Sequence, residues 1–341
     1  MLYQDAFGII TKYMLSDFEK VSVYYIFLKR GDRMLDSFLT VSQQVLILFV
    51  LIAIGYVCGK TKLINETGSK AMTEVVLYFV TPCVIINAFQ REFDVTMLIK
   101  LVVSAVCSAL ILLFSVLVAQ LLFKKHNPNK ASIYKFATVF SNCGFMSLPL
   151  QQALLGDEGV FFGATFVAMF NIYVWSYGLI TMKGKSEKGA GLKILINPGI
   201  IGTIIGIVLF LCSVTLPTIV AQPVSYMAAL NTPVPMLIIG FYLSQADLKK
   251  AFTDVWSYVS MGLRLIVLPL VTLFALLLCG IDGVLLVSLI ISVASPVAAI
   301  TTMMSAKYGR DTELSVSLVS ASTLVSLVTM PLIVGFAQYL S

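Results

Sequence analysis

The chain has 341 residues, of which 59% are apolar and only 12% are charged, and its formal net charge is +6. Soluble domains carry about twice that share of charged residues, so a water-soluble protein of this length is excluded, and lipid must surround most of the chain. The single histidine, His126, excludes sites that need two imidazoles, such as HExxH zinc sites. The composition therefore predicts an all-α integral membrane protein.

Residues 1–36 differ from the rest of the chain. They contain five basic and five acidic side chains, so their charge indicates no orientation in the membrane. The aromatic residues in VSVYYIFLKR are typical of an amphipathic segment that lies at the membrane interface. Alternatively, Met34 is the physiological start and the preceding residues are not native. Both interpretations stay open.

Long charge-free stretches mark the predicted membrane spans. A spanning helix needs about 20 such residues, because lipid offers no partner to its backbone groups. Two further spans contain one charge each, Ala71–Gln90 with Glu74 and Val255–Ile281 with Arg264. The longest stretch holds two spans with a turn near Leu216, so the total is ten. The charge-free stretches are Ser37–Gly59, Leu101–Phe123, Phe136–Gly156, Gly159–Met182, Ile194–Ala246, Gly283–Ala306 and Leu314–Ser341.

Lysine and arginine are distributed unevenly between the predicted loops. If the loop after the first span is cytoplasmic, fifteen basic residues fall on the cytoplasmic side, and only Arg91 and Lys100 fall on the other. Such an excess is typical of cytoplasmic loops. It predicts a multi-pass protein of the plasma membrane with both termini outside the cytoplasm.

The ten spans divide into residues 37–182 and 198–341, with a cytoplasmic loop at 183–197. An odd number of spans in each half means that a duplicated unit would be inverted in the membrane. Residues of the same type occupy matching positions in the two halves. The sequence thus predicts two inverted five-helix repeats. The matching pairs are Pro82 with Pro235, Lys100 with Arg264, and Pro149 with Pro296.

The fourth and ninth spans, TVFSNCGFMSLPLQQALLG and LIISVASPVAAITTMMSA, combine proline with clustered polar residues. Proline interrupts helices, and Ser295-Pro296 has the N-cap and first-residue pattern of a helix start. A helix that restarts in mid-membrane presents partly positive amide groups, which predicts an anion site, most simply for a carboxylate. The alternative is a simple kink with hydroxyls bonded to their own helix. The candidate ligands are Ser141, Asn142, Gly144, Pro149, Ser295, Pro296 and Thr301.

Arg264 is predicted about ten residues into the eighth span, where an arginine costs about 2.5–3.5 kcal/mol on insertion scales. It could attract an anionic substrate, brace a packed carbonyl, or extend toward the cytoplasm. By contrast, no acidic residue lies at the centre of a span, and Glu74 lies near a cytoplasmic end. An antiporter built on buried carboxylates is therefore disfavoured. We expect no cofactor, and coupling to H⁺ or Na⁺ stays open.

Cysteine and asparagine within the spans predict structural roles. The six cysteines show no CxxC spacing and are expected to pack as small buried hydrophobic residues. Asn87 and Asn171 are expected to form hydrogen bonds between helices.

Several segments resemble the auxin efflux carrier family, particularly the bacterial branch that includes proteins called malate permeases. They span about residues 37–341 and are VLILFVLIAIGYVCGKTKLIN, LYFVTPCVIINAF, SNCGFMSLPLQQALLG, PVPMLIIGFYLSQADL, LRLIVLPL, SPVAAITTMMSAKYGRD and STLVSLVTMPL. The resemblance implies ten helices in two inverted repeats, a scaffold and a transport domain, and broken fourth and ninth helices that cross at the substrate site. It places Asn142 and Pro149 at the first crossing segment and Pro296 at the second.

The chain departs from the plant members of that family at two points. It has Ser295 where they carry an amide, and it lacks their long central loop. The resemblance therefore implies a bacterial dicarboxylate such as malate, or a similar organic anion, rather than auxin.

These observations predict a secondary transporter that moves a small organic anion by alternating access, with an elevator-like movement of one domain. Arg264 and the half-helix dipoles would attract the anion, and Asn142 with the hydroxyls would bind it. An enzyme is disfavoured because His126 lies in a loop and no carboxylate pair is buried. A ligand-binding sensor on the same fold, without net transport, is the alternative. We expect the anion and the bilayer as partners, no nucleic acid, and leave a homodimer open.

Overall fold

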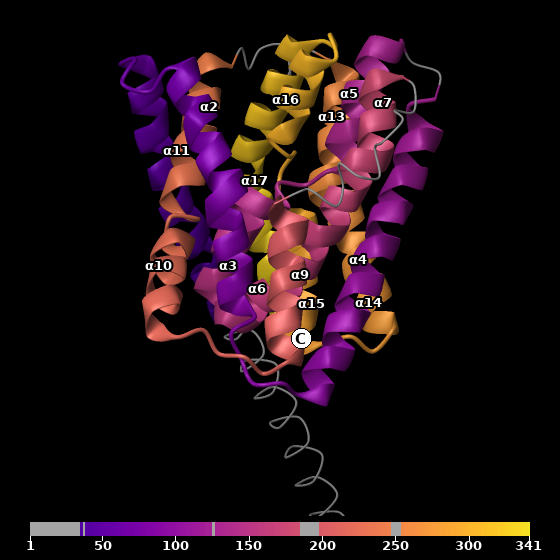
Figure 1. The fold of residues 1–341 in the computed structure, drawn as a ribbon. Helices are drawn as coiled ribbons and strands as arrows, with labels where there is room; N and C mark the ends of the chain where they lie inside the picture. Colours follow the sequence, from indigo (N-terminus) through magenta and orange to yellow (C-terminus); the bar gives the residue numbers. More distant parts are fainter. Residues whose placement is uncertain (1–34, 37, 125–126, 185–197, 247–253) are drawn as a thin grey trace, which may run out of the picture.

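The computed structural model describes residues 35–36, 38–124, 127–184, 198–246 and 254–341. Within these ranges the chain is a bundle of helices that run roughly parallel to one axis, as Figure 1 shows. Most of the 1–36 segment, His126 and most of the 183–197 loop lie outside the described residues.

Seven helices of the described chain are long and apolar enough to cross a membrane, judged by length and composition. They begin and end near the predicted limits, for example Phe38–Lys60 and Glu66–Ala88. A multi-pass membrane protein is therefore confirmed, whereas ten helices in inverted repeats stay a prediction. After helix Phe38–Lys60, the described chain divides into α2 Glu66–Val75, η1 Val76–Val80, α3 Thr81–Ala88, α4 Val95–Leu122, α5 Pro128–Val139, η2 Cys143–Ser147, α6 Leu148–Tyr173, η3 Val174–Gly178, α7 Leu179–Lys183, α9 Pro198–Leu211, α10 Thr218–Ala229, α11 Pro233–Gln245, α13 Val255–Gly262, η4 Leu263–Val267, α14 Leu268–Leu278, α15 Gly283–Ala294, α16 Ile300–Lys307 and α17 Thr312–Leu340.

The continuous helical segment Cys143–Lys183 is too long for one crossing. A straight helix of its 41 residues would measure about 60 Å, twice the thickness of the hydrocarbon core. Gly156 resolves this, because its backbone is non-helical at φ 64° and ψ −155°, a region open essentially to glycine alone. The break falls at the boundary predicted between the spans Phe136–Gly156 and Gly159–Met182.

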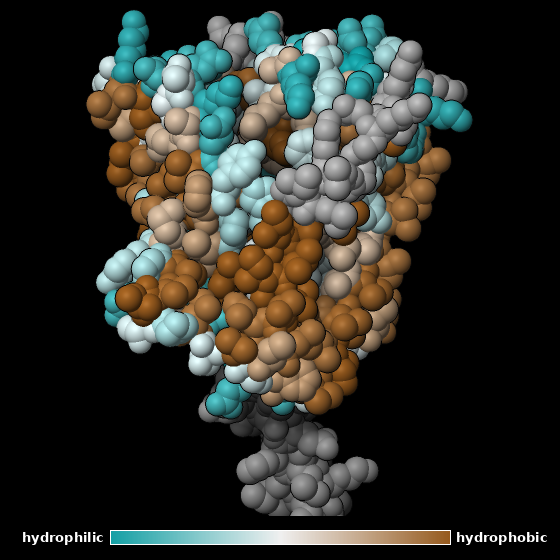
Figure 2. Space-filling view, viewed as in Figure 1, coloured by the Kyte–Doolittle hydropathy of each residue, from teal (hydrophilic) through white to brown (hydrophobic). Residues whose placement is uncertain are grey.

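The polarity of α4 shows which environment surrounds the bundle. Val102, Val106 and Leu110 are exposed along one face of the helix, whereas Ser104 and Ser108 are buried on the other. A soluble helix has the reverse arrangement. Figure 2 shows an apolar surface over most of the visible face, with polar side chains gathered at one end. The surface is suited to contact with lipid.

Three prolines within the bundle coincide with π-helical turns. Pro82, Pro149 and Pro269 are the second residues after η1, η2 and η4, and the residue four positions before each proline lies at the centre of the π-turn. Proline clashes with the carbonyl of that residue in a regular helix, and a π-turn is one of the adjustments that relieve such a clash. These prolines therefore widen a turn and do not end a helix.

The helices form two groups. The panel comprises residues 38–88 and 198–245, and the core comprises 95–183 and 255–340; Figure 1 shows the panel helices α10, α11 and α3 on the left. Gly55 and Gly240 bring helix Phe38–Lys60 and α11 into backbone contact. Gly202 does the same for α9 and α3, since an added Cβ atom would lie 2.8 Å from the Cα of Pro82, and Gly206 of α9 packs against the side chain of Phe89, 2.9 Å from an added Cβ atom. Small residues at such spacing are typical of close helix pairs in membranes.

The two ends of the bundle differ in charge. Lys60, Lys183 and Arg310 lie at the end where α2 begins and α7 ends, the upper end in Figure 1. The C-terminus lies at the opposite end, and Phe38 packs there against Gly335 of α17. Both ends of the described chain thus share one side of the bundle. Their orientation relative to the cytoplasm stays a prediction.

Only one of the three matched pairs expected from a repeat has comparable surroundings. Pro82 and Pro235 both lie in the panel near a glycine contact. Lys100, however, is exposed near the start of α4, whereas Arg264 is buried. Pro149 lies inside a helix, whereas Pro296 lies between helices. These two pairs do not support the expected symmetry.

We predict that Gly240→Ala destabilises the protein, because the added Cβ would overlap the backbone of Ile52 and Tyr56. Gly262→Ala is the matched control, since it too lies within a helix and an added Cβ there meets no atom within 4 Å. Thermal unfolding of the purified variants in detergent measures the difference. Equal transition temperatures would show that the panel does not depend on this contact.

Candidate functional site

Two interruptions in the core helices meet at the centre of the bundle. α5 ends at Val139 and η2 begins at Cys143, while α15 ends at Ala294 and α16 begins at Ile300. Each of the segments between them begins with an extended residue, Phe140 or Ser295, and Ser141 forms an antiparallel bridge with Val297. We call this pair of segments, 140–142 and 295–299, the crossing.

Backbone hydrogen bonds hold the crossing together. The amide of Asn142 donates to the carbonyl of Pro296 at 2.7 Å, and the amide of Ala298 donates to the carbonyl of Phe140 at 3.0 Å. Each broken segment therefore provides hydrogen-bond partners for backbone groups of the other. An unpaired backbone group in a lipid-surrounded core would cost several kcal/mol, so neither segment is expected to keep this shape alone.

The causes of the two breaks differ from those predicted. At the second break, Ser295 is extended because it precedes proline. It does not cap the next helix as predicted, since its hydroxyl donates to the carbonyl of Ile291 at 2.9 Å and α16 begins at Ile300. At the first break, the interruption lies well before Pro149, which is accommodated within the helix by η2. The expected position of Pro149 at the break is therefore wrong.

The helices that leave the crossing begin with amide groups that donate to no backbone carbonyl of the described chain. Gly144 and Phe145 lie in the first turn of one helix, and Ala299 and Ile300 begin the other. No backbone carbonyl of the described residues accepts from these four amides. Amides in the first turn of a helix carry the positive end of its dipole. The crossing thus offers two partly positive helix starts.

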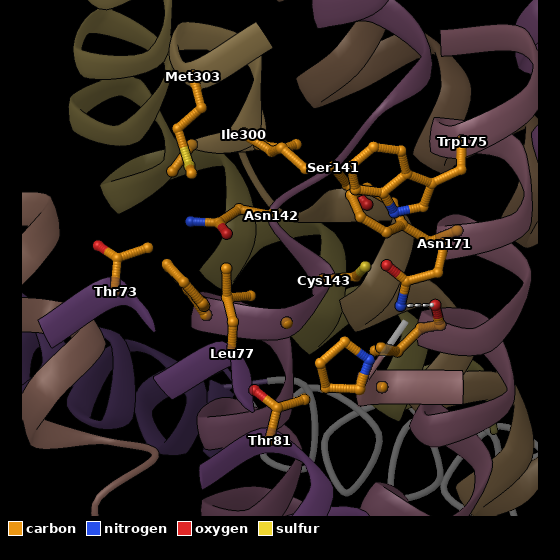
Figure 3. Close-up of a pocket in the computed structure, with 18 of the residues that line it drawn as sticks. Thr73, Leu77, Thr81, Ser141, Asn142, Cys143, Asn171, Trp175, Ile300 and Met303 are labelled. Atoms are coloured by element: carbon orange, nitrogen blue, oxygen red, sulfur yellow. Dashed lines mark hydrogen bonds between the residues drawn. The ribbon is translucent and has the colours of Figure 1, made fainter. Parts of the chain in front are cut away.

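A cavity of about 170 Å³ lies beside the crossing, between the core and the panel. Both helix starts line it, and Figure 3 shows the Asn142 amide projecting from the crossing toward Thr73 of the panel. That volume is enough for a small organic molecule or several waters. The lining residues are Thr73, Leu77, Tyr78, Thr81, Ser141, Asn142, Cys143, Gly144, Phe145, Val167, Phe170, Asn171, Trp175, Pro198, Gly199, Tyr242, Ala298, Ala299, Ile300 and Met303.

Several polar groups in the cavity wall have no partner within the described chain. The Ser141 and Thr81 hydroxyls and the Trp175 indole nitrogen are buried without a hydrogen bond. The side-chain amide of Asn142, a residue only 5% exposed, also faces the cavity. Buried polar groups are normally paired, so these orphans are suited to bind a ligand. No charged side chain lines the cavity among the residues described.

Arg264 contacts the crossing from within the core and does not line the cavity. Its guanidinium donates to the carbonyls of Thr138 at 3.2 Å, Val139 at 3.0 Å, and Val293. The side chain is 1% exposed and does not extend toward the surface. Of its three predicted roles, the structure shows the bracing of packed carbonyls.

The remaining predicted ligands separate into two sets. Ser141, Asn142 and Gly144 line the cavity together, whereas Pro149, Ser295, Pro296 and Thr301 do not. The Thr301 hydroxyl is buried without a partner among the described residues. Asn171, predicted to join two helices, instead donates to Val167 of its own helix at 2.9 Å and faces the cavity.

The sequence reasoning missed the panel side of the cavity and its aromatic wall. The motif NIYVWSYG, with Asn171 and Trp175 one turn apart, was a local signal for part of it. For Thr73 and Thr81 no local signal exists. The cysteine prediction also holds only in part: Cys143 is buried, whereas Cys212 and Cys279 are exposed.

Tight packing closes the bundle on the side away from the lysine-rich end. Phe89 lies about 12 Å beyond Thr81 along α3 and stacks on Phe161, with ring centroids 4.6 Å apart. Phe210 of α9 contacts both rings, and Arg91 lies over Phe161 at 4.5 Å from the ring centroid. This aromatic cluster separates the cavity from that end of the bundle.

Comparison with known proteins is consistent with this architecture. Residues 40–334 match the profile of the family described as "Membrane transport protein", which comprises the auxin efflux carriers. The chain belongs to this family. An uncharacterized transporter of Methanocaldococcus jannaschii is 25% identical over 301 residues, covering 84% of this chain and 96% of that protein. An uncharacterized transporter of Methanothermobacter thermautotrophicus is 23% identical over 304 residues, covering 86% and 98%.

Membership of the auxin efflux carrier family confirms the resemblance at the level of the family and identifies the chain as a membrane transport protein, while the bacterial malate-permease branch stays a prediction. The family match spans both the panel and the core, so all the residues that line the cavity lie within the matched range.

We predict that Gly144→Leu folds with the stability of the wild type, because an added Cβ at this position meets no atom within 4 Å. The leucine would occupy the cavity and displace water, so the emission of Trp175 should move to shorter wavelength. In a Trp256→Phe background Trp175 is the remaining tryptophan. Unfolding as severe as that of Gly240→Ala would contradict an open cavity beside Gly144.

Proposed function

We propose that the protein is a secondary transporter that carries a small organic anion by alternating access, with the anion bound in the cavity at the crossing. The observation that carries the proposal is the set of unpaired amide groups there. Gly144, Phe145, Ala299 and Ile300 supply backbone donors, and Asn142 supplies a side-chain donor. Helix starts of this kind bind carboxylate and phosphate groups.

Each polar group has a defined role in the proposed complex. The carboxylate of the anion accepts from the helix starts and from Asn142, and the hydroxyl of Ser141 completes its shell. Hydrogen bonds to a charged group are stronger than those between neutral groups, and they gain further where water is excluded. Arg264 acts from behind, by fixing the carbonyl ends of α5 and α15.

The rest of the cavity suits an apolar body more than a second charge. Tyr78, Phe145, Phe170 and Trp175 contribute aromatic surface, and no charged side chain of the described chain faces the cavity. A second carboxylate would lose its hydration without a counter-charge, which is costly. We therefore favour a monocarboxylate with an apolar group over the dicarboxylate that the family resemblance implied.

We propose that the core moves against the panel during transport. The cavity lies between the two groups, and the aromatic cluster closes it on the side opposite the lysine-rich end. If that end is cytoplasmic, as the excess of basic residues indicates, this conformation faces the cytoplasm. Moving the core would carry the crossing, together with Phe161, past Phe89 and Phe210 and expose the site on the other side.

We predict that Asn142→Ala lowers transport or substrate affinity roughly ten- to hundredfold, the effect of losing a hydrogen bond to a charged group. The wild-type and variant proteins are compared by flux of labelled carboxylates in proteoliposomes, with folding checked by thermal unfolding. Asn87→Ala is the matched control, because Asn87 lies in a span but does not line the cavity. Unchanged transport by a folded Asn142→Ala protein would refute the site.

We also predict that monocarboxylates such as phenylacetate compete more strongly than malate for the cavity. Inhibition by malate should increase as the pH falls, because protonation of one carboxyl removes the charge that has no partner in the cavity. The quenching of Trp175 in the Trp256→Phe protein measures binding, and proteoliposome flux distinguishes a transporter from a sensor. Tighter binding of fully ionised malate would overturn the preference for a single charge.

A further inference from the structure

Arg264 is a buried cation without a carboxylate partner among the described residues. Its guanidinium lies on the last carbonyls of two helices, Thr138 and Val139 of α5 and Val293 of α15. A charge removed from water must be balanced nearby. The ends of these two helices are therefore its counter-charge.

The negative charge of the two helix ends is about equal to the positive charge of the guanidinium. The C-terminal end of a helix carries an effective charge of about −0.5, so the ends of α5 and α15, each 12 residues long, together supply about −1. One guanidinium supplies +1. The carbonyl side of the crossing is thus neutralised within the protein, while its amide side remains free toward the cavity.

In transporters with broken helices, the carbonyl ends of half-helices and the unwound backbone between them are general binding positions for a coupling cation. Here Arg264 occupies that position. We propose that Arg264 is a resident cation that replaces a mobile coupling cation at the crossing, so that this site binds no Na⁺ during transport. The inference rests on the proposed function for its consequence in transport, but the electrostatic balance is measurable without transport.

Arg264 acts through the backbone of the crossing and is therefore a positioning residue. A purely steric role would require only that its space be filled. A resident cation makes a different demand, because the carbonyl ends need positive charge, whichever group supplies it. Rescue of a truncated variant by a free cation distinguishes the two roles.

The test uses the full-length protein in detergent and follows thermal unfolding of the wild type, Arg264→Ala and Leu265→Ala. Leu265 is the matched control, because it is the next residue, is equally buried and carries no charge. Each protein is measured with choline chloride, with NaCl, and with guanidinium chloride at millimolar concentrations far below those that denature proteins.

We expect the wild type to unfold at the same temperature in choline and in Na⁺. Arg264→Ala should unfold several degrees lower in choline and recover part of that loss with guanidinium, and to a smaller degree with Na⁺. Leu265→Ala should show no recovery with either cation. Stabilisation of the wild type by Na⁺ at the crossing, or equal responses of the two alanine variants to guanidinium, would overturn the proposal.

If Arg264→Ala yields no folded protein, Arg264→Lys and Arg264→Gln supply the answer, because lysine keeps the positive charge, whereas glutamine is a shorter, neutral side chain that can still donate hydrogen bonds. The proposal requires that the lysine variant fold and the glutamine variant be strongly destabilised. Equal yields and equal transition temperatures of these two would contradict it.

Proteoliposome flux separates this inference from the proposed function. Wild-type flux should be unchanged when choline replaces Na⁺ on both sides of the membrane, and flux that requires Na⁺ would refute the resident cation. Absence of flux for every carboxylate would count against the proposed function, while the unfolding data would still decide the role of Arg264.

Discussion

The structure depends on the requirement that backbone groups surrounded by lipid find partners within the protein. Two core helices break near the middle of the bundle, and each break supplies hydrogen bonds that the other lacks, between Asn142 and Pro296 and between Ala298 and Phe140. Arg264 then satisfies the carbonyls that remain at the ends of α5 and α15. What is left unpaired is a small set of amides, and they face the cavity. The candidate site therefore consists of the backbone groups that find no backbone partner where the two broken helices meet.

The crossing separates the two ends of the helix dipoles. The positive helix starts and the Asn142 side chain face the cavity, whereas the negative ends meet a guanidinium in the core. In the proposed function, these dipoles would attract an anion to a cavity whose described walls carry no charged side chain. Dipoles fixed by the backbone need no reorientation when the anion binds. They also leave most of the wall apolar, which limits how much charge the cavity can accommodate.

Different kinds of contact join the helices within the panel, within the core and around the cavity. Within the panel, glycine contacts bring helix backbones together, as at Gly55 with α11 and Gly202 with α3. Within the core, polar pairs such as Gln151 with Ser292, at 2.9 Å, join α6 to α15. Between panel and core, the contacts around the cavity are largely side chains with rotational freedom, among them Tyr78 and Met303.

The sequence by itself determined the environment of the chain, the approximate limits of its apolar helices, and the two segments that carry the crossing, because charge-free length and clustered polar residues are local properties. It identified Ser141, Asn142 and Gly144 for the same reason. Only the tertiary structure decided that the first break precedes Pro149, because a π-turn lets the helix absorb that proline and no local pattern predicts the pairing of Ser141 with Val297. It also decided between the three roles of Arg264, which depend on where the ends of α5 and α15 meet, and it brought Thr73, Thr81 and Trp175 to one cavity from distant parts of the chain. These features arise from contacts between segments far apart in sequence, and a single helix carries no information about its neighbours.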